Sequence, residues 1–302
     1  VGFEEVKPWR AMRLVDRVQK LIDEKKPTAD ELLALQQDTV SLETVELAGI
    51  LADHCPKSVD GYSDEDVAAF CKAIASMKKG DHTVDSLAVP FTLTNRHFQL
   101  AVFEAMVDDE LANDLTDDSW SGMALIDVTK AEHAGDVKAA IFDDPRRPGR
   151  EGLDGFVARA IKRALDVAAK DHGLSEGDWR WGRPHTMSVR GALADAPVVG
   201  FLFDTWSHEE SGTGSAPRAE HPHFGRQLKV RHGAGLRLIA EMKEDGADVR
   251  MINDSGNSGH FGHRHLDDQN PLWSVGTPVR LQLSKKQVEE VLEGSLDLLP
   301  KK

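Results

Sequence analysis

The sequence has few of the features that mark disulfide-rich, membrane-spanning or exported chains. Its 302 residues include only two cysteines, Cys55 and Cys71, too few for a disulfide framework or a cysteine-based zinc site. Although two thiols allow one bridge, we expect free, buried thiols. No apolar run is long enough to cross a membrane. The first residues, Val1 to Val6, form neither a signal peptide nor a transit peptide and include no initiator Met, which fits a processed chain or a fragment.

Acidic residues outnumber basic ones. The chain has 37 Lys and Arg against 51 Asp and Glu, a formal net charge of −14. We therefore expect neither nucleic acid nor an anionic membrane as a partner, even though the first helical segment carries Arg10, Arg13 and Arg17. The chain is 40% hydrophobic and 29% charged, which is ordinary for a globular protein.

Several catalytic and metal-binding motifs are absent. Neither Gly212–Ser215 nor Ser255–Ser258 forms the Gly-x-Ser-x-Gly turn of a serine hydrolase, and His208-Glu209-Glu210 is not His-Glu-x-x-His. The pairs His221-x-His223 and His263-x-His265 place imidazoles at alternate positions, but neither has a third ligand at a fixed spacing. No Asp-x-Asp-x-Asp calcium loop is present. We expect no metal bound by this chain.

The first half of the chain has helical periodicity and the second half has strand-like alternation. Thr28 and Glu31 form a capping box before the second helix, and Gly173 is placed to end the strongest one. We expect helices over Pro8–Lys25, Leu32–Gln37, Ser41–Ala52, Ser63–Met77, Asp85–Asn113, Trp120–His133 and Leu153–His172. We expect strands at Val198–Phe203, at two places within Lys229–Ile239, at Asp248–Ile252 and at Pro278–Leu283, with a polar loop over Ser207–Phe224 and a final helix over Gln287–Leu298. This order predicts an α+β fold in a single region, 1–302, with residues 1–175 mainly helical and 176–302 mainly strands with a terminal helix.

The most specific stretch is the loop Asn253–Trp273. Gly256, Gly259 and Gly262 recur every third residue, which excludes a helix. Ordered loops of this length are usually functional or packed by their own side chains.

Two motifs, one in this loop and one earlier in the chain, resemble those of the penicillin acylase family of N-terminal-nucleophile amide hydrolases. That family carries Gly-Gln-Ser-Gly, then Ser-Pro-His-Tyr-x-Asp-Gln and a Trp. Here Gly256, Ser258, Gly259, His265, Asp268, Gln269 and Trp273 match, whereas Asn257, His263, Arg264 and Leu266 depart. The family also carries Trp-x-Trp-Gly-x-x-His after a helix that ends in Gly, and Trp179, Trp181, Gly182 and His185 match it.

The resemblance implies the back portion of a four-layer αββα fold, from the C-terminal part of the family's β chain. The family's nucleophile is a Ser at the start of an autoprocessed chain, with its own α-amino group as base. Residue 1 here is Val1, so the resemblance implies no catalytic residue in this chain, which alone would be inactive. The partners implied are the α chain and the N-terminal part of the β chain. The substrate implied is a small-molecule amide, such as a β-lactam side chain or an N-acyl homoserine lactone. Family members often bind one calcium through upstream residues and are periplasmic or extracellular.

Arg13 is the residue that the resemblance implies as a support of the active site. Arg10 and Arg17 compete for this role, and a solvated helical arginine is the simpler interpretation. Gly256, Ser258, Gly259, His265, Asp268 and Gln269 are expected to hold the loop in shape, although His265 with Asp268 is also a candidate catalytic or metal pair. Trp179, Trp181 and His185 are expected to anchor the junction between helices and strands.

Two functions from other classes remain open on the sequence. One is a non-catalytic binding or scaffold module of the same fold, and the other is a free-standing histidine-dependent metal protein.

Overall fold

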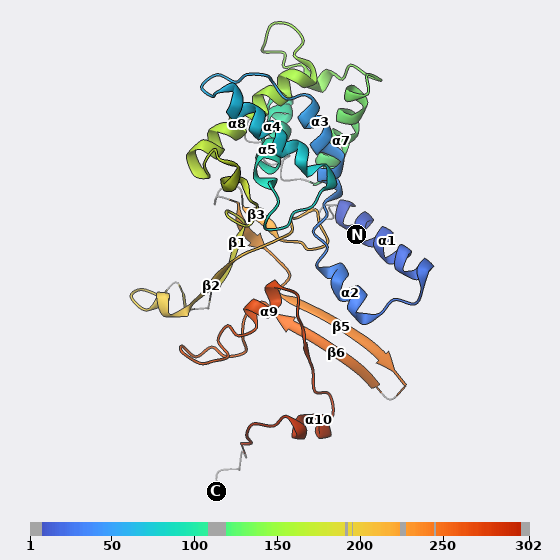
Figure 1. Cartoon of the computed structure of the whole chain (residues 1–302), viewed down its shortest axis with the longest axis vertical. Helices are drawn as coiled ribbons and strands as arrows, with labels where there is room; N and C mark the ends of the chain where they lie inside the picture. Colours follow the sequence, from blue (N-terminus) through green and yellow to red (C-terminus); the bar gives the residue numbers. More distant parts are fainter. Residues whose placement is uncertain are drawn as a thin grey trace.

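A computed structural model describes residues 8–107, 119–190, 193–194, 196–223, 228–244 and 246–296. The molecule is elongated, with a helical body at one end, short sheets beneath it, and a long hairpin and the last helix at the other end (Figure 1). The chain exposes 17,583 Å² of surface. A compact monomer of this mass is expected to expose about 12,600 Å². The larger surface agrees with the elongated shape of the molecule (Figure 1).

Most helices follow the sequence expectation closely, but α9 (Asn270–Ser274) was not predicted. It includes Asn270–Trp273, the end of the loop in which we expected no helix. The helices are α1 (Pro8–Glu24), α2 (Ala29–Gln36), α3 (Leu42–Asp53), α4 (Asp64–Ser76), α5 (Ala88–Met106), α7 (Ser119–His133), α8 (Gly152–Asp171), α9 (Asn270–Ser274) and α10 (Lys285–Glu290), with single turns η1 (Met77–Lys79), η2 (Ala140–Phe142), η3 (Glu176–Trp179) and η4 (Gly200–Phe203). The capping box of Thr28 and Glu31 is present. Ser41 and Ser63 cap α3 and α4 by a single contact, in which each side chain accepts a hydrogen bond from a backbone N–H. None of the helices in the described ranges is both long and apolar enough to span a membrane.

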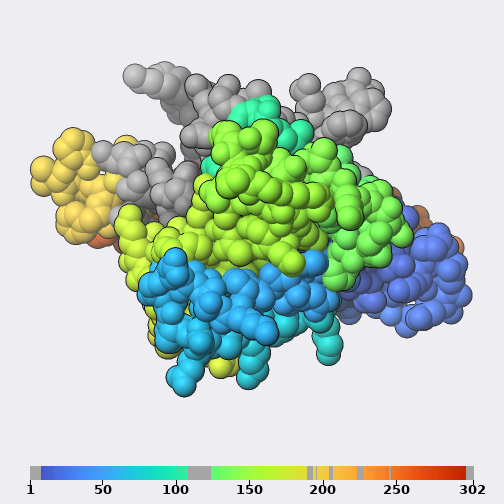
Figure 2. Space-filling model, turned by 90° about the horizontal axis from the view of Figure 1, so that it is seen from above, coloured from blue at the N-terminus to red at the C-terminus, as the bar shows by residue number. Residues whose placement is uncertain are grey.

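The helical body is built around α5 and α8, which pack against each other. The apolar face predicted for α8 is buried along its length, because Phe156, Ile161 and Leu165 are fully enclosed. Apart from Leu228, the members of this core lie between Trp9 and Trp181. Seen from above, the α8 region lies over the middle of this body with the α3–α4 region beside it (Figure 2).

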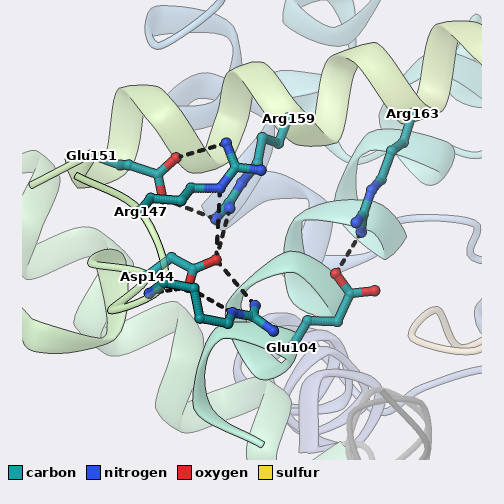
Figure 3. Close-up of polar contacts among 7 residues, drawn as sticks. Glu104, Asp144, Arg147, Glu151, Arg159 and Arg163 are labelled. Carbon is teal, nitrogen blue, oxygen red and sulfur yellow. Dashed lines mark hydrogen bonds and ion pairs between the residues drawn. The ribbon is translucent and has the colours of Figure 1, made fainter. Parts of the chain in front are cut away.

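Ion pairs and hydrogen bonds connect the segment that leads into α8 to α8 itself (Figure 3). The buried carboxylate of Asp144 accepts hydrogen bonds from Arg146 Nε at 2.9 Å and from Arg159 Nη1 at 3.2 Å. Arg163 Nη1 donates to Glu104 Oε2 at 2.8 Å, which joins α8 to α5. The hydrogen bond from the Arg146 guanidinium is the main reason that the pKa of Asp144 lies well below its usual range.

The strands form small antiparallel sheets. Strand β1 (Thr186–Arg190) pairs with β2 (Asp204–Glu209), β3 (His221–His223) pairs with β4 (Lys229–His232), and β5 (Leu236–Lys243) pairs with β6 (Gly246–Asn253), which also pairs with β7 (Val279–Arg280). The β5–β6 register runs from Leu236 opposite Asn253 to Lys243 opposite Gly246. The predicted α+β class is therefore confirmed.

Three of the predictions for the second half were wrong. Val198–Phe203 is not a strand, because Val198 has φ 70° and the chain then turns into η4, leaving Val198 90% exposed. The predicted polar loop Ser207–Phe224 contains the end of β2 and all of β3. The final helix ends at Glu290 and not at Leu298, which lies outside the described residues, as do residues 108–113 of the predicted Asp85–Asn113 helix.

The two cysteines form a disulfide bond, which corrects the expectation of free thiols. Cys55 follows the end of α3 and Cys71 lies on α4. Because α3 and α4 pack together, the two Cα atoms lie 6.1 Å apart, within the usual range for a bridge. Helical periodicity in the sequence carried no information on this pairing, which depends on how two helices meet.

Reduction of this bond is expected to lower the free energy of unfolding by about 3 kcal/mol, because a bond across 16 residues restricts the unfolded chain. Urea unfolding with and without a reductant measures the effect. The double variant Cys55→Ser/Cys71→Ser serves as the control, since its midpoint should not respond to the reductant. Equal midpoints for the native chain under both conditions would contradict the prediction.

Candidate functional site

A buried polar centre lies where the helical body meets the strands. It joins the turn after α2, the segment between β2 and β3, strand β5 and helix α9. Its charged members are two arginines and two glutamates, Arg218, Arg237, Glu210 and Glu220, all of them buried. Four ionic groups in the interior must be closely paired, because an isolated buried charge is strongly unfavourable.

Arg218 connects three of these segments. Its Nη2 donates to the Glu210 carboxylate and, at 2.7 Å, to the carbonyl oxygen of Ser274 in α9. Its Nη1 donates to Gln37 Oε1 at 2.9 Å, and its backbone N–H donates to the Asp38 carbonyl at 2.9 Å. One side chain thus ties the end of α2 to α9.

Arg237, on β5, makes the second set of contacts. Its Nη1 donates to the carbonyl oxygen of Trp273, and its Nη2 donates to Glu220 Oε1 at 3.1 Å. The guanidinium carbon lies 4.0 Å from the centroid of the Trp273 ring, a cation–π contact. Trp273 Nε1 in turn donates to the Ala234 carbonyl at 2.8 Å. The end of the Asn253–Trp273 loop is therefore fastened to the start of β5.

Burial dominates the electrostatics of the centre. It raises the pKa of Glu220 to about 7 and lowers the pKa of Arg237 to about 10. Arg237 remains a cation at neutral pH, whereas Glu220 is poised to titrate there. Glu220 Oε2 has no hydrogen-bond partner within the described part of the chain. Chemically, this arrangement is a charged clamp that contains one carboxyl group with a pKa near neutrality.

Arg13 reaches the edge of this centre. Its Nε donates to Asp38 Oδ2 at 2.9 Å, while Arg17 Nε lies 3.7 Å from the same oxygen. Asp38 is also the residue whose carbonyl accepts from Arg218. With its side chain 20% exposed, Arg13 is paired and half-buried, which differs from the solvated arginine that was the simpler interpretation. Its role as a support of the active site stays a prediction.

The junction residues are held by hydrogen bonds to the backbone, one of them to the segment between β2 and β3. Trp179 Nε1 donates to the Gly173 carbonyl at 3.2 Å, and Trp181 Nε1 donates to the Gly212 carbonyl at 2.8 Å. The His185 ring stacks on Trp181 with centroids 4.2 Å apart, and its Nδ1 donates to the Leu228 carbonyl at 3.0 Å. Burial lowers the pKa of His185 to about 3, so the ring stays neutral. These contacts are those of an anchor, since every polar group named here binds the backbone.

The glycine-rich loop is held by its own backbone. Gly256 N donates to the Leu266 carbonyl at 3.0 Å, and Ser258 N donates to the His265 carbonyl at 2.8 Å. A Cβ on Gly256 would lie 2.1 Å from the His265 carbonyl oxygen, so only glycine fits there. Gly259 meets no such neighbour. Gln269 Oε1 accepts from Asn253 N at 3.1 Å and closes the base of the loop.

His265 and Asp268 do form a pair, with 2.6 Å between Nδ1 and Oδ2. They are exposed on the surface of the loop, whereas the charged centre is buried. In the described part of the chain, no three or more His, Cys, Asp or Glu residues are arranged to hold a metal ion, so that part does not fit a calcium site built from carboxylates. His223 of the sequence pair His221-x-His223 has a side chain outside the described set.

Sequence reasoning missed Arg218, Glu210 and Glu220 as members of one centre. They lie in the segment interpreted as a polar loop, where charge alone suggested exposure to solvent. One signal was present: Gly212 and Gly214 alternate with small residues in that segment, and a Cβ on Gly212 would lie 2.3 Å from the Arg218 carbonyl oxygen. Such close backbone approach indicates a packed segment.

Comparison with known proteins gives a consistent result. A family model described as penicillin amidase matches residues 2–290. An acyl-homoserine lactone acylase, QuiP, from Pseudomonas putida is 20% identical over 298 residues, which cover 94% of this chain and 36% of that protein. The structure of a thermostable penicillin G acylase from Alcaligenes faecalis superimposes with a TM-score of 0.52 at 12% identity, covering 96% of this chain and 52% of that one. The chain thus spans between about a third and a half of the length of the proteins it matches.

Proposed function

The chain belongs to the penicillin amidase family, and we propose that it forms part of an amide hydrolase whose nucleophile is supplied by a segment outside residues 1–302. The observation that carries this proposal is the family match over residues 2–290, joined to the partial coverage of both relatives. In this proposal a Ser hydroxyl attacks the amide carbonyl, and backbone N–H groups stabilise the oxyanion. The present chain contributes scaffold and a wall of the substrate pocket.

The contacts of the described residues support this division of roles. The buried ionisable groups of the centre are engaged with one another, since Arg218 binds Glu210 and Arg237 binds Glu220. A general base for amide hydrolysis must be free to approach the substrate. The centre instead holds α9 and β5 in fixed positions, which suits a scaffold.

The exposed surface supports the proposal that further polypeptide packs on this chain. The three-stranded sheet β5–β6–β7 leaves apolar side chains open, including Leu236, Leu238 and Met242, the last 78% exposed. The apolar face of a sheet is normally covered by another layer of structure. We propose that the rest of the acylase covers it, and that the sheets described here belong to a larger four-layer αββα arrangement.

For the substrate we propose a secondary amide that joins an acyl group to a small amine. The relatives named above are a homoserine lactone acylase and a penicillin G acylase, so the amine is expected to be a homoserine lactone or a β-lactam nucleus. We propose Arg13 with Asp38 as the supporting pair, because it connects α1 to the buried centre.

The test begins with the intact mass and N-terminal sequence of the native protein, which identify any accompanying polypeptide. Hydrolysis of phenylacetyl and long-chain acyl anilides is then compared for the complete assembly and for residues 1–302 alone. We expect activity from the assembly only. Activity from residues 1–302 alone would refute the assignment of the nucleophile. An assembly that is inactive on every acyl length would favour the non-catalytic scaffold.

A further inference from the structure

Two histidines face each other at the surface of the helical body, far from the polar centre in the fold. His54 follows the last residue of α3, and His133 is the last residue of α7. The distance from His54 Nε2 to His133 Nδ1 is 3.0 Å, and the ring centroids lie 5.2 Å apart. In the view from above, the segments that carry these helix ends lie on the visible face of the body (Figure 2), and α7 packs against α3 and α8.

The outer nitrogen of each ring faces a carboxylate. Asp154 Oδ1 lies 2.5 Å from His54 Nδ1, and Asp53 Oδ2 lies 3.9 Å from His133 Nε2. A carboxylate fixes the proton of a neutral imidazole on the nitrogen that faces it. Asp154 thus holds the proton of His54 on Nδ1, which leaves the lone pair of His54 Nε2 directed at His133 Nδ1 across 3.0 Å. Either the Nδ1–H of His133 or a metal ion can fill the space between these two nitrogens, and a metal ion would place the His133 proton on Nε2, on the side of Asp53.

The surroundings also favour a cation. The C-terminal ends of α3 and α7, which carry partial negative charge, both meet at this point. Asp53 and Asp154 add two carboxylates, and Lys78 Nζ, at 4.0 Å from Asp53 Oδ1, is the basic group that faces them. The Cys55–Cys71 bond fixes the residue directly after His54, so that this ring is held on a rigid part of the fold.

We propose that His54 Nε2 and His133 Nδ1 bind one divalent transition-metal ion of the zinc type, with water as the remaining ligands and with Asp154 and Asp53 orienting the rings. Tetrahedral coordination at about 2.1 Å from each nitrogen requires the two nitrogens to lie about 3.4 Å apart. The pair therefore needs to open by about 0.4 Å, a small movement for half-exposed side chains. This site does not depend on the proposed function, and the ion would fasten α7 to α3.

The other neighbouring pair, His263 and His265, lacks this property although its ring centroids lie only 5.4 Å apart. His265 Nε2 accepts a hydrogen bond from Arg264 Nε at 3.0 Å, and its Nδ1 faces Asp268. His263 Nδ1 accepts from the backbone N–H of His265 at 3.1 Å. Three of the four ring nitrogens are thus engaged, which makes this pair a matched control with the same number of imidazoles.

The experiment is calorimetric titration of the native protein, with any accompanying polypeptide, with Zn²⁺ at pH 7.5. We expect one site that is lost in His54→Ala and in His133→Ala and retained in His263→Ala/His265→Ala. Asp154→Asn should weaken binding about 10-fold, because it removes the partner that orients His54. Circular dichroism confirms that each variant is folded. With Cu²⁺ in place of Zn²⁺, the electron paramagnetic resonance spectrum should show two nitrogen ligands.

Two outcomes would overturn the proposal. One is retention of the zinc site in His54→Ala/His133→Ala together with its loss in the control. The other is the absence of any zinc binding by the native protein, which would leave a hydrogen bond between the two rings as the reason for their contact.

Discussion

Arg237→Met is expected to lower the free energy of unfolding by about 3–5 kcal/mol at pH 8, because it leaves the buried carboxylate of Glu220 without its partner. The same change removes the donor to the Trp273 carbonyl and the cation–π contact with the Trp273 ring. Urea unfolding followed by tryptophan fluorescence measures the loss. Arg231→Met is the matched control: Arg231 is exposed on β4, and its replacement should change stability by less than about 0.5 kcal/mol.

Glu220→Gln tests the electrostatic part of this prediction. The pKa of Glu220 is about 7 in the folded chain against an ordinary value of 4.5, so the folded state binds the extra proton between these pH values. Stability of the native chain should therefore fall as the pH rises from about 4.5 to 7, by about 3 kcal/mol, and Glu220→Gln should flatten this slope. Glu220→Gln should also rescue part of the loss in Arg237→Met. A loss in Arg237→Met that Glu220→Gln leaves unchanged would show that shape, and not charge, governs this site.

Asp144→Ala is expected to lower the free energy of unfolding by about 2–4 kcal/mol. Its carboxylate accepts from Arg146 and Arg159, and of these Arg159 is half-buried on α8 (Figure 3). Removal of the carboxylate leaves the Arg159 guanidinium with Glu151 Oε2, at 3.4 Å, as its remaining carboxylate. Thermal unfolding of the variant gives the size of the effect.

Asp143→Ala provides the control for Asp144→Ala, since it removes an exposed carboxylate one residue earlier in the same segment. It should be within about 0.5 kcal/mol of the native chain. Equal losses in the two variants would mean that the segment itself, and not the ion pairs of Asp144, determines stability here.

The parts of the fold that depend on neighbouring residues were predictable from the sequence. The Thr28–Glu31 capping box acts within four residues, and the buried face of α8 follows from the spacing of Phe156, Ile161 and Leu165. Both features depend on residues that lie close together in the sequence, so their pattern can be read without knowledge of the tertiary structure.

The parts that depend on long-range contacts were not predictable in this way. The Cys55–Cys71 bond requires the packing of α3 on α4, and Glu220 meets Arg237 only once β3 and β5 are placed. Val198–Phe203 looked like a strand because it is apolar, but Pro197 precedes it and Gly200 interrupts it. Motif spacing singled out the loop residues, but it carried no information on the buried centre to which Trp273 connects them.

The uneven placement of the core has a consequence for synthesis. Apart from Leu228, the core members are complete once residue 181 has been made. At ribosomal rates of about 5–20 residues per second, residues 182–302 take roughly 6 to 24 s to follow. The helical body can therefore condense on the ribosome first, and the strands dock later on a surface that is already formed.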